Sequence, residues 1–211
     1  MTVVDLSFPL TGTSVPRDHG YALYGAITTC VPALHGTDWL GVHPIGGRLA
    51  DAALLLGRTS EVRLRLPAER IPDVLALAGA RLVLGGSPVR LGPPTVRALA
   101  PRPALDARLV LLKLTDPPRR ANAELARDVL DNDAIAERYR AELGRQLAAI
   151  EVTAELALCG RRSMTIKGKR LLGYSVRLTG LDADASLRVQ EHGLGGRRAM
   201  GCGLFRPTRG K

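Results

Sequence analysis

The sequence has few aromatic residues, few cysteines and no long hydrophobic run. Aromatic residues make up 3% of the chain, so a partner nucleic acid would be recognised through phosphates and folded shape rather than by base stacking. Cys30, Cys159 and Cys202 lie far apart without a CxxC pair, which excludes a disulfide framework and the familiar zinc patterns. No segment resembles a membrane span, and Asp5 interrupts the apolar amino terminus too early for a signal peptide. We therefore expect a cytoplasmic protein without membrane contact.

Basic residues outnumber acidic ones. Thirty Lys and Arg oppose twenty Asp and Glu, giving a formal charge of +10, so polyanions are the expected partners. Most of the basic residues are arginine, which suits bidentate phosphate recognition but also matches the codon usage of a GC-rich genome. Hydrophobic residues make up 45% of the chain and charged residues 24%, a balance typical of a folded protein.

The first half of the sequence alternates between strand and helix patterns. Strands are predicted at residues 3–10, 40–44, 54–56, 62–66, 81–84 and 89–91. Helices are predicted at residues 16–34 and 67–79. The order is β-α-β-β-α-β, which is the ferredoxin-like unit.

A proline-rich connection then leads into a second half with the same order. Strands are predicted at residues 106–114, 153–158, 163–166, 171–178 and 202–205, and helices at 134–150 and 182–191. The sequence thus predicts an α+β protein with tandem ferredoxin-like (RRM-like) domains. We place the domains at residues 1–100 and 101–211.

A segment rich in glycine and arginine, GLGGRRAMGCGLF, occupies residues 193–205. Gly193, Gly195 and Gly196 let backbone amides approach phosphate oxygens, and Arg197 and Arg198 add forked donors. This favours binding of a phosphodiester backbone over a long mobile turn. The dinucleotide fingerprint and the phosphate-binding loop of NTPases are both excluded, because neither the glycine spacing nor the following Lys-Ser/Thr pair is present.

Together with four earlier segments, this loop resembles the CRISPR-associated repeat-cleaving endoribonucleases of the RAMP superfamily, in particular the Myxococcus-type subgroup. The earlier segments are PRDHGYALY (16–24), LH (34–35), GVHPI (41–45) and RLRLP (63–67). The resemblance implies two ferredoxin-like domains and cleavage of precursor CRISPR RNA within its repeats without a metal or cofactor. It also implies CRISPR repeat RNA and a multi-subunit effector complex as partners.

In enzymes that this chain resembles, the catalytic histidine lies in or just after the first helix, which matches His19 and His35. At the predicted helix start, His19 suits a neutral base or a capping role, and His35 at the helix end suits a protonated acid or a C-terminal cap. Tyr21 can assist through its phenol or belong to the core. The sequence does not choose between the two histidines.

Basic residues also gather around a predicted hairpin tip in the second domain. Lys167, Lys169 and Arg170 lie at the tip, and Arg161 and Arg162 flank it. They can contact the groove or phosphates of a repeat stem, or they form an ordinary solvated turn.

Three functions remain open. The first is a metal-independent endoribonuclease that leaves a 2′,3′-cyclic phosphate and retains the mature guide RNA. The second is a non-catalytic subunit that binds guide RNA, in which the histidines serve the fold. The third is an unrelated ferredoxin-like RNA-binding module, which the basic charge permits but the glycine-arginine loop disfavours.

Overall fold

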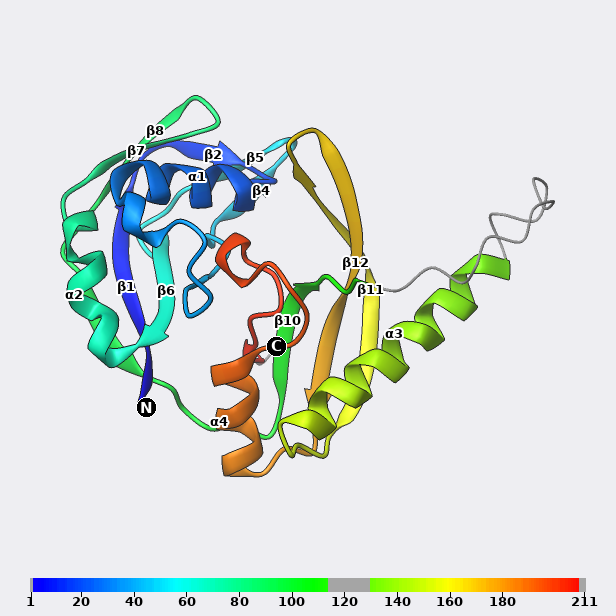
Figure 1. Cartoon of the computed structure of the whole chain (residues 1–211). Helices are drawn as coiled ribbons and strands as arrows, with labels where there is room; N and C mark the ends of the chain where they lie inside the picture. The colour runs from blue at the N-terminus through cyan, green and yellow to red at the C-terminus, as the bar shows by residue number, and fades with distance from the viewer. Residues whose placement is uncertain (1, 114–129, 209–211) are drawn as a thin grey trace. The chain divides into compact units, whose positions relative to one another are not determined.

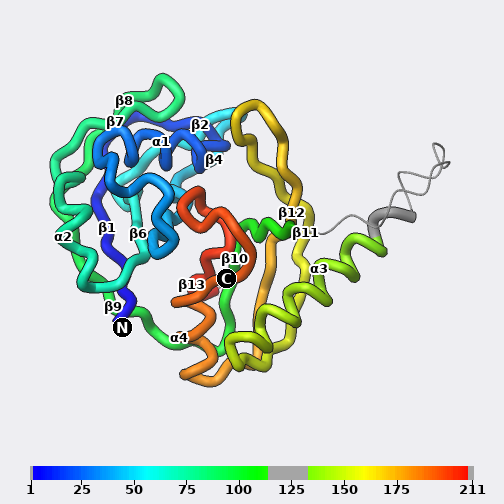
Figure 2. The backbone as a smooth tube through the Cα atoms, in the orientation of Figure 1, coloured from blue at the N-terminus to red at the C-terminus, as the bar shows by residue number. Residues whose placement is uncertain are grey.

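The computed structural model describes residues 2–113 and 130–208, and its chain path is drawn in Figures 1 and 2. Two compact units are present. Unit 1 comprises Met1–Ala100, Met164–Leu171 and Arg197–Cys202. Unit 2 comprises Pro101–Ser163, Leu172–Gly196 and Gly203–Lys211. The sequence places the border between two domains after residue 100. That residues 1–100 and 101–211 fold independently stays a prediction.

Unit 1 is built on one mixed-length sheet in which β1 is central. The strand order is β3-β6-β1-β8-β7, and β9 also pairs with β1. The strands are β1 (Val3–Thr11), β3 (Gly41–Val42), β6 (Glu61–Pro67), β7 (Arg81–Leu84), β8 (Ser87–Leu91) and β9 (Thr95–Ala98). The strand pairs of this sheet are antiparallel, and the β1–β6 register runs from Val3 opposite Pro67 to Pro9 opposite Glu61.

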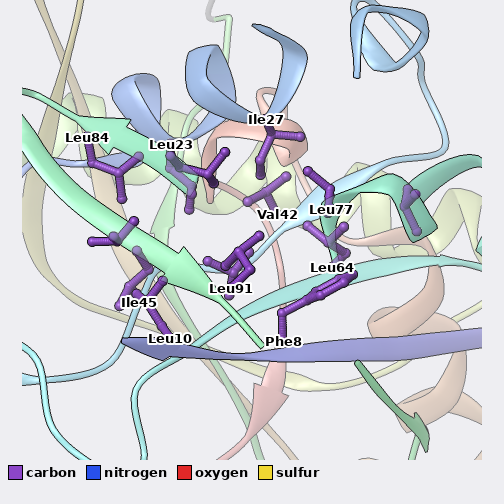
Figure 3. Packing of buried hydrophobic residues seen from close by; sticks show 14 of the residues in the cluster. Phe8, Leu10, Leu23, Ile27, Val42, Ile45, Leu64, Leu77, Leu84 and Leu91 are labelled. Atoms are coloured by element: carbon purple, nitrogen blue, oxygen red, sulfur yellow. The ribbon is translucent and has the colours of Figure 1, made fainter. Parts of the chain in front are cut away.

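Helical segments cover the apolar face of this sheet. They are α1 (Gly20–Cys30), η1 (Pro32–Leu34), η2 (Ala68–Arg70), α2 (Ile71–Val74) and η3 (Leu75–Leu77). Because strand side chains alternate between faces, Phe8 and Leu64 point into the same core, where Leu23 and Ile27 of α1 meet them (Figure 3). A small second sheet, not foreseen as a separate sheet, is formed by β2 (Ser14–Pro16), β5 (Ala53–Leu55) and β4 (Arg48–Ala50).

Unit 2 contains a four-stranded sheet in the order β11-β12-β10-β13. Its elements are β10 (Leu105–Val110), α3 (Leu130–Ala149), β11 (Glu155–Ile166), β12 (Lys169–Thr179), α4 (Ala183–His192) and β13 (Arg206–Pro207). Tyr139 and Leu143 of α3 and Val189 of α4 pack with the sheet residues Val176 and Leu178. The predicted α+β class with two ferredoxin-like sheets is confirmed.

Several element boundaries differ from the prediction. The last strand is Arg206–Pro207, paired with Asp106 and Leu105, and not residues 202–205. Gly203 has φ +68°, which breaks an extended strand there. Strand β9 was predicted as a stiff proline-rich connection, although its residues 95–98 contain no proline. Residues 153–166 form one strand from Glu155 rather than two, and the predicted strand end at residue 114 lies outside the described residues.

None of the helices in residues 2–113 and 130–208 has the length and hydropathy needed to cross a membrane.

Candidate functional site

His35 lies on the surface of unit 1, directly after α1 and η1. It caps η1, with its backbone N–H donating to the Pro32 carbonyl at 3.0 Å. Its ring stacks on that of Tyr24, with centroids 5.9 Å apart and planes inclined by 27°. The Tyr24 hydroxyl accepts a hydrogen bond from the Gly36 N–H at 2.9 Å, which fixes the backbone next to His35. His35 is therefore an exposed imidazole on an ordered support.

His19 is placed differently, since only 3% of the residue is exposed. Its Nε2 accepts a hydrogen bond from the Ile45 N–H at 2.9 Å, so the ring proton of the neutral form is on Nδ1. Nδ1 lies 3.0 Å from the Pro16 carbonyl and donates to it. His19 thus joins the start of α1 to the segment after β3. This geometry suits a structural role better than proton transfer, and it puts His35 first among the two histidines.

Tyr21 is half-buried in the first turn of α1. The sequence did not single out Tyr24, the tyrosine that contacts His35. The sequence does contain a hint of this contact. Tyr24 and His35 belong to adjoining helical segments in a chain that has few other aromatic residues.

A buried ionic cluster lies on the polar side of the β1–β6 pair. Arg65 donates to Asp5 in bidentate fashion, at 2.8 Å from Nε and 3.0 Å from Nη2. His43 Nε2 lies 3.5 Å from the same carboxylate, a long contact. Burial alone raises the pKa of the Asp5 carboxyl, but His43 and Arg65 outweigh it and hold that pKa well below its usual range. Burial lowers the pKa of His43 to about 4, and Arg65 adds to this lowering against the opposing effect of Asp5.

The depressed pKa of His43 predicts acid lability. The pKa of His43 is 6.5 in the unfolded chain and about 4 in the folded protein. The neutral ring therefore favours the folded state fully above pH 6.5, and this contribution is lost as pH falls through 4. We expect the free energy of unfolding to fall by about 3 kcal/mol across that window. Urea unfolding between pH 4 and pH 8 measures it. His43→Gln is expected to flatten the profile, whereas the exposed His192→Gln leaves it unchanged; equal profiles for wild type and His43→Gln contradict the assignment.

The arginine pair lies at the start of the short helix η4 (Arg198–Met200) of unit 1, where Arg197 is the N-cap residue, and η4 contacts α1 and β3. Arg197 is exposed in the left-handed conformation, with φ +66°. Arg198 is half-buried. Burial lowers the pKa of its guanidinium, Arg65 lowers it further, and Asp38 raises it. Asp38 follows His35 by three residues, so the loop that carries His35 lies within electrostatic reach of Arg198.

The predicted basic hairpin exists, with a two-residue turn at its tip. Lys167 has φ +49° and Gly168 φ +75°, the signs of a type I′ turn. Lys167, Lys169 and Arg170 are exposed in unit 1. Arg161 and Arg162 are exposed in unit 2, where Arg161 Nε donates to the Tyr174 hydroxyl at 3.4 Å.

The local backbone explains why most of the glycines in residues 193–203 are glycine. Gly193, Gly195, Gly201 and Gly203 have positive φ. A Cβ on Gly195 would lie 2.5 Å from the Leu111 carbonyl oxygen, and one on Gly203 would lie 2.1 Å from that of Leu194. Gly196 differs, because a Cβ there meets nothing within 4 Å. The segment is therefore a tightly packed turn rather than a long mobile one.

Gly203→Ala is expected to destabilise the protein by about 2–4 kcal/mol, because alanine resists this φ and its methyl overlaps backbone. Gly196→Ala is the matched control in the same turn and should change stability by less than about 0.5 kcal/mol. Urea denaturation followed by circular dichroism compares the two variants. Similar urea midpoints for the two variants would show that packing does not require glycine at position 203.

In residues 2–113 and 130–208, no group of three or more His, Cys, Asp or Glu side chains is placed to hold a metal ion.

Comparison with known proteins decides the family. The family model described as "Cas6 Crispr" matches residues 4–210. The chain belongs to the Cas6 family. It is 40% identical over 207 residues to a Myxococcus xanthus (strain DK1622) protein named CRISPR-associated endonuclease Cas6, covering 98% of this chain and 82% of that one.

Solved structures share the Cas6 fold at low sequence identity. One, titled "CRISPR associated protein Cas6", superposes with a TM-score of 0.67 at 16% identity over 98% of this chain and 100% of that one. Another, a Cas6-related gene product from Pyrococcus furiosus, gives 0.63 at 12% identity over 97% and 98%. These likenesses establish the tandem ferredoxin-like architecture of this Cas6 chain.

Proposed function

We propose that this Cas6-family chain is a metal-independent endoribonuclease that cuts precursor CRISPR RNA within its repeats. The observation that carries the proposal is the exposed His35 imidazole, held on Tyr24, in a loop whose Asp38 acts electrostatically on Arg198. The name of the Myxococcus xanthus relative, an endonuclease, supports it. The net charge of +10 supports a polyanionic substrate.

The proposed chemistry moves two protons at the phosphate that is cut. The ribose 2′-oxygen attacks the adjacent phosphorus and loses its proton, and the bond from phosphorus to the 5′-oxygen breaks as that oxygen gains a proton. The products are a 2′,3′-cyclic phosphate and a free 5′-hydroxyl. His35 moves one of these protons, since an imidazole exchanges protons near neutral pH. Arg197 and Arg198 stabilise the charge that develops on the phosphate oxygens.

His19 and Tyr21 remain weaker candidates for the second proton transfer, because His19 is buried between two backbone partners. The exposed cations of the hairpin, Lys167, Lys169 and Arg170, bind phosphates of the repeat. Arg161, Arg162 and the turn that contains the glycines at 193, 195 and 196 complete the proposed RNA-binding set. The backbone amides of these three glycines donate within the protein, to Val189, Gln146 and Leu111, so the turn would bind RNA through its arginines rather than through these amides. Retention of the cut guide RNA, delivery to a multi-subunit effector complex and a cytoplasmic location belong to the same proposal.

The test is incubation of purified protein with end-labelled repeat RNA in excess EDTA, beside the same RNA with a 2′-deoxy nucleotide at the cut position. One cut in the normal RNA, a 2′,3′-cyclic phosphate end and a resistant deoxy substrate are expected. Cutting of the deoxy RNA contradicts attack by the 2′-hydroxyl. Loss of cutting in EDTA contradicts metal independence.

A non-catalytic guide-RNA-binding subunit is the alternative. It predicts tight binding of repeat RNA without any cut, and the same incubation read on a native gel distinguishes it from the nuclease.

A further inference from the structure

Asp18, just before α1, makes an unusual long-range contact within unit 1. Its Oδ2 accepts a hydrogen bond from the backbone N–H of Thr165 at 2.7 Å, across 147 residues of sequence. Thr165 belongs to β11, which is the edge strand of its sheet, and it lies two residues before the Lys167–Gly168 turn. An ionised acceptor makes such a bond shorter and about twice as strong as one between neutral groups.

The neighbouring residues are packed at the same place. A Cβ on Gly20 would lie 2.4 Å from the Met200 carbonyl oxygen and 3.2 Å from Met164 Cε. Met164 Sδ in turn lies 3.2 Å from Cys202 Sγ, and both residues are buried. The start of α1 therefore contacts the hairpin tip through Asp18 and Met164, and the η4 turn through Gly20.

Both of these partners carry exposed cations. The hairpin tip presents Lys167, Lys169 and Arg170, and the η4 turn presents Arg197. The other end of α1 leads through η1 to His35. A backbone bond to Asp18 thus ties the position of the hairpin cations to the helix that precedes His35.

We propose that Asp18 is a positioning residue for RNA: its hydrogen bond to Thr165 holds the basic hairpin tip where Lys167, Lys169 and Arg170 meet the substrate backbone. The proposal rests on the proposed function. Asp18 itself touches no phosphate, because two anions repel each other. Its effect on RNA passes entirely through the hairpin.

A positioning role and a purely electrostatic role of Asp18 predict opposite changes in RNA affinity when Asp18 is removed. Removing an exposed negative charge beside basic residues strengthens binding of a polyanion when the charge acts only through the field. Removing the hydrogen bond releases the tip and weakens binding. Asp18→Ala removes both charge and acceptor, whereas Asp18→Asn removes the charge and keeps an acceptor oxygen.

The experiment compares wild type, Asp18→Ala, Asp18→Asn and a control, Asp133→Ala, which deletes an exposed acidic charge on α3. Hydrogen exchange by mass spectrometry on residues 163–171 is measured without RNA, and dissociation constants and single-turnover cleavage rates are measured with repeat RNA. Asp18→Ala is expected to exchange faster in that segment and to raise the dissociation constant about tenfold. Asp18→Asn and Asp133→Ala should stay close to wild type or bind slightly tighter.

A combined variant tests whether the effect passes through the hairpin. In a background of Lys167→Ala, Lys169→Ala and Arg170→Ala, adding Asp18→Ala is expected to weaken binding no further. The proposal is overturned if Asp18→Ala weakens RNA binding in that background as much as it does in the wild type. It is also overturned if the single variant Asp18→Ala shows unchanged hydrogen exchange in residues 163–171 or binds RNA as tightly as the wild type. If wild type neither binds nor cuts repeat RNA, the proposed function fails, and the exchange data then decide alone whether Asp18 holds the tip.

Discussion

Replacing His35 by alanine is expected to slow single-turnover cleavage of repeat RNA by about 10²- to 10⁴-fold, the usual contribution of general acid–base catalysis. The dissociation constant should change little, because the proposal assigns phosphate binding to the cations of the hairpin and of the η4 turn and not to His35. Quenched-flow or manual time courses with enzyme in excess measure the rate, and filter binding with the 2′-deoxy RNA measures affinity.

His192→Ala is the matched control, since His192 is also an exposed histidine at the end of a helix, α4 in unit 2. It should cut at nearly the wild-type rate. A His35→Ala protein that cuts normally, or a His192→Ala protein equally impaired, rejects the catalytic assignment. In that event His19→Ala becomes the next variant, with its stability checked first because its ring nitrogens bind two backbone segments.

Replacing Arg65 by leucine is expected to have the largest effect on stability, a loss of about 3–5 kcal/mol. Arg65 is 1% exposed and its removal leaves the Asp5 carboxylate buried without its bidentate donor. Trp39, the single tryptophan, belongs to unit 1, so its fluorescence in urea reports the unfolding of that unit.

The chain offers a control with the same chemistry and different burial. Arg177 binds Asp106 through two bonds of 2.7 and 3.2 Å on the exposed surface of unit 2. Arg177→Leu should shift the urea midpoint followed by circular dichroism much less than Arg65→Leu does, because water screens exposed pairs. Equal losses for the two variants would mean that burial of the Asp5–Arg65 pair does not set its contribution.

The sequence predicts the parts of the fold that depend on local pattern. The alternation in residues 62–66 predicted β6, and the basic tip at residues 167–170 predicted the hairpin of β11 and β12, because period-two patterning and turn geometry are local properties. The strand before the tip was nevertheless predicted as two strands, whereas β11 is one. Strand β9 was missed because surrounding prolines obscured it, although it gains stability from pairing with β1. Strand β13 was misplaced because its ladder to β10 depends on a partner about a hundred residues away.

The candidate site divides in the same way. The residue types suited to RNA chemistry, such as His35 and Arg198, stand out in the sequence. The contacts of these residues do not stand out in the sequence. Tyr24 contacts His35 only after the chain has turned from α1 into η1, and Asp5 contacts Arg65 only after β1 and β6 have paired. The bond from the Ile45 N–H to the buried His19 ring joins segments 26 residues apart, and no sequence period encodes it.

The packed turn at residues 193–203 has a consequence for reading evolutionary conservation in this family. Backbone geometry alone explains glycine at Gly193, Gly195, Gly201 and Gly203, so relatives that keep the turn should keep those glycines whether or not they bind RNA. Gly196 is under no such constraint. Its retention or loss across relatives is therefore the more informative record of selection by a ligand.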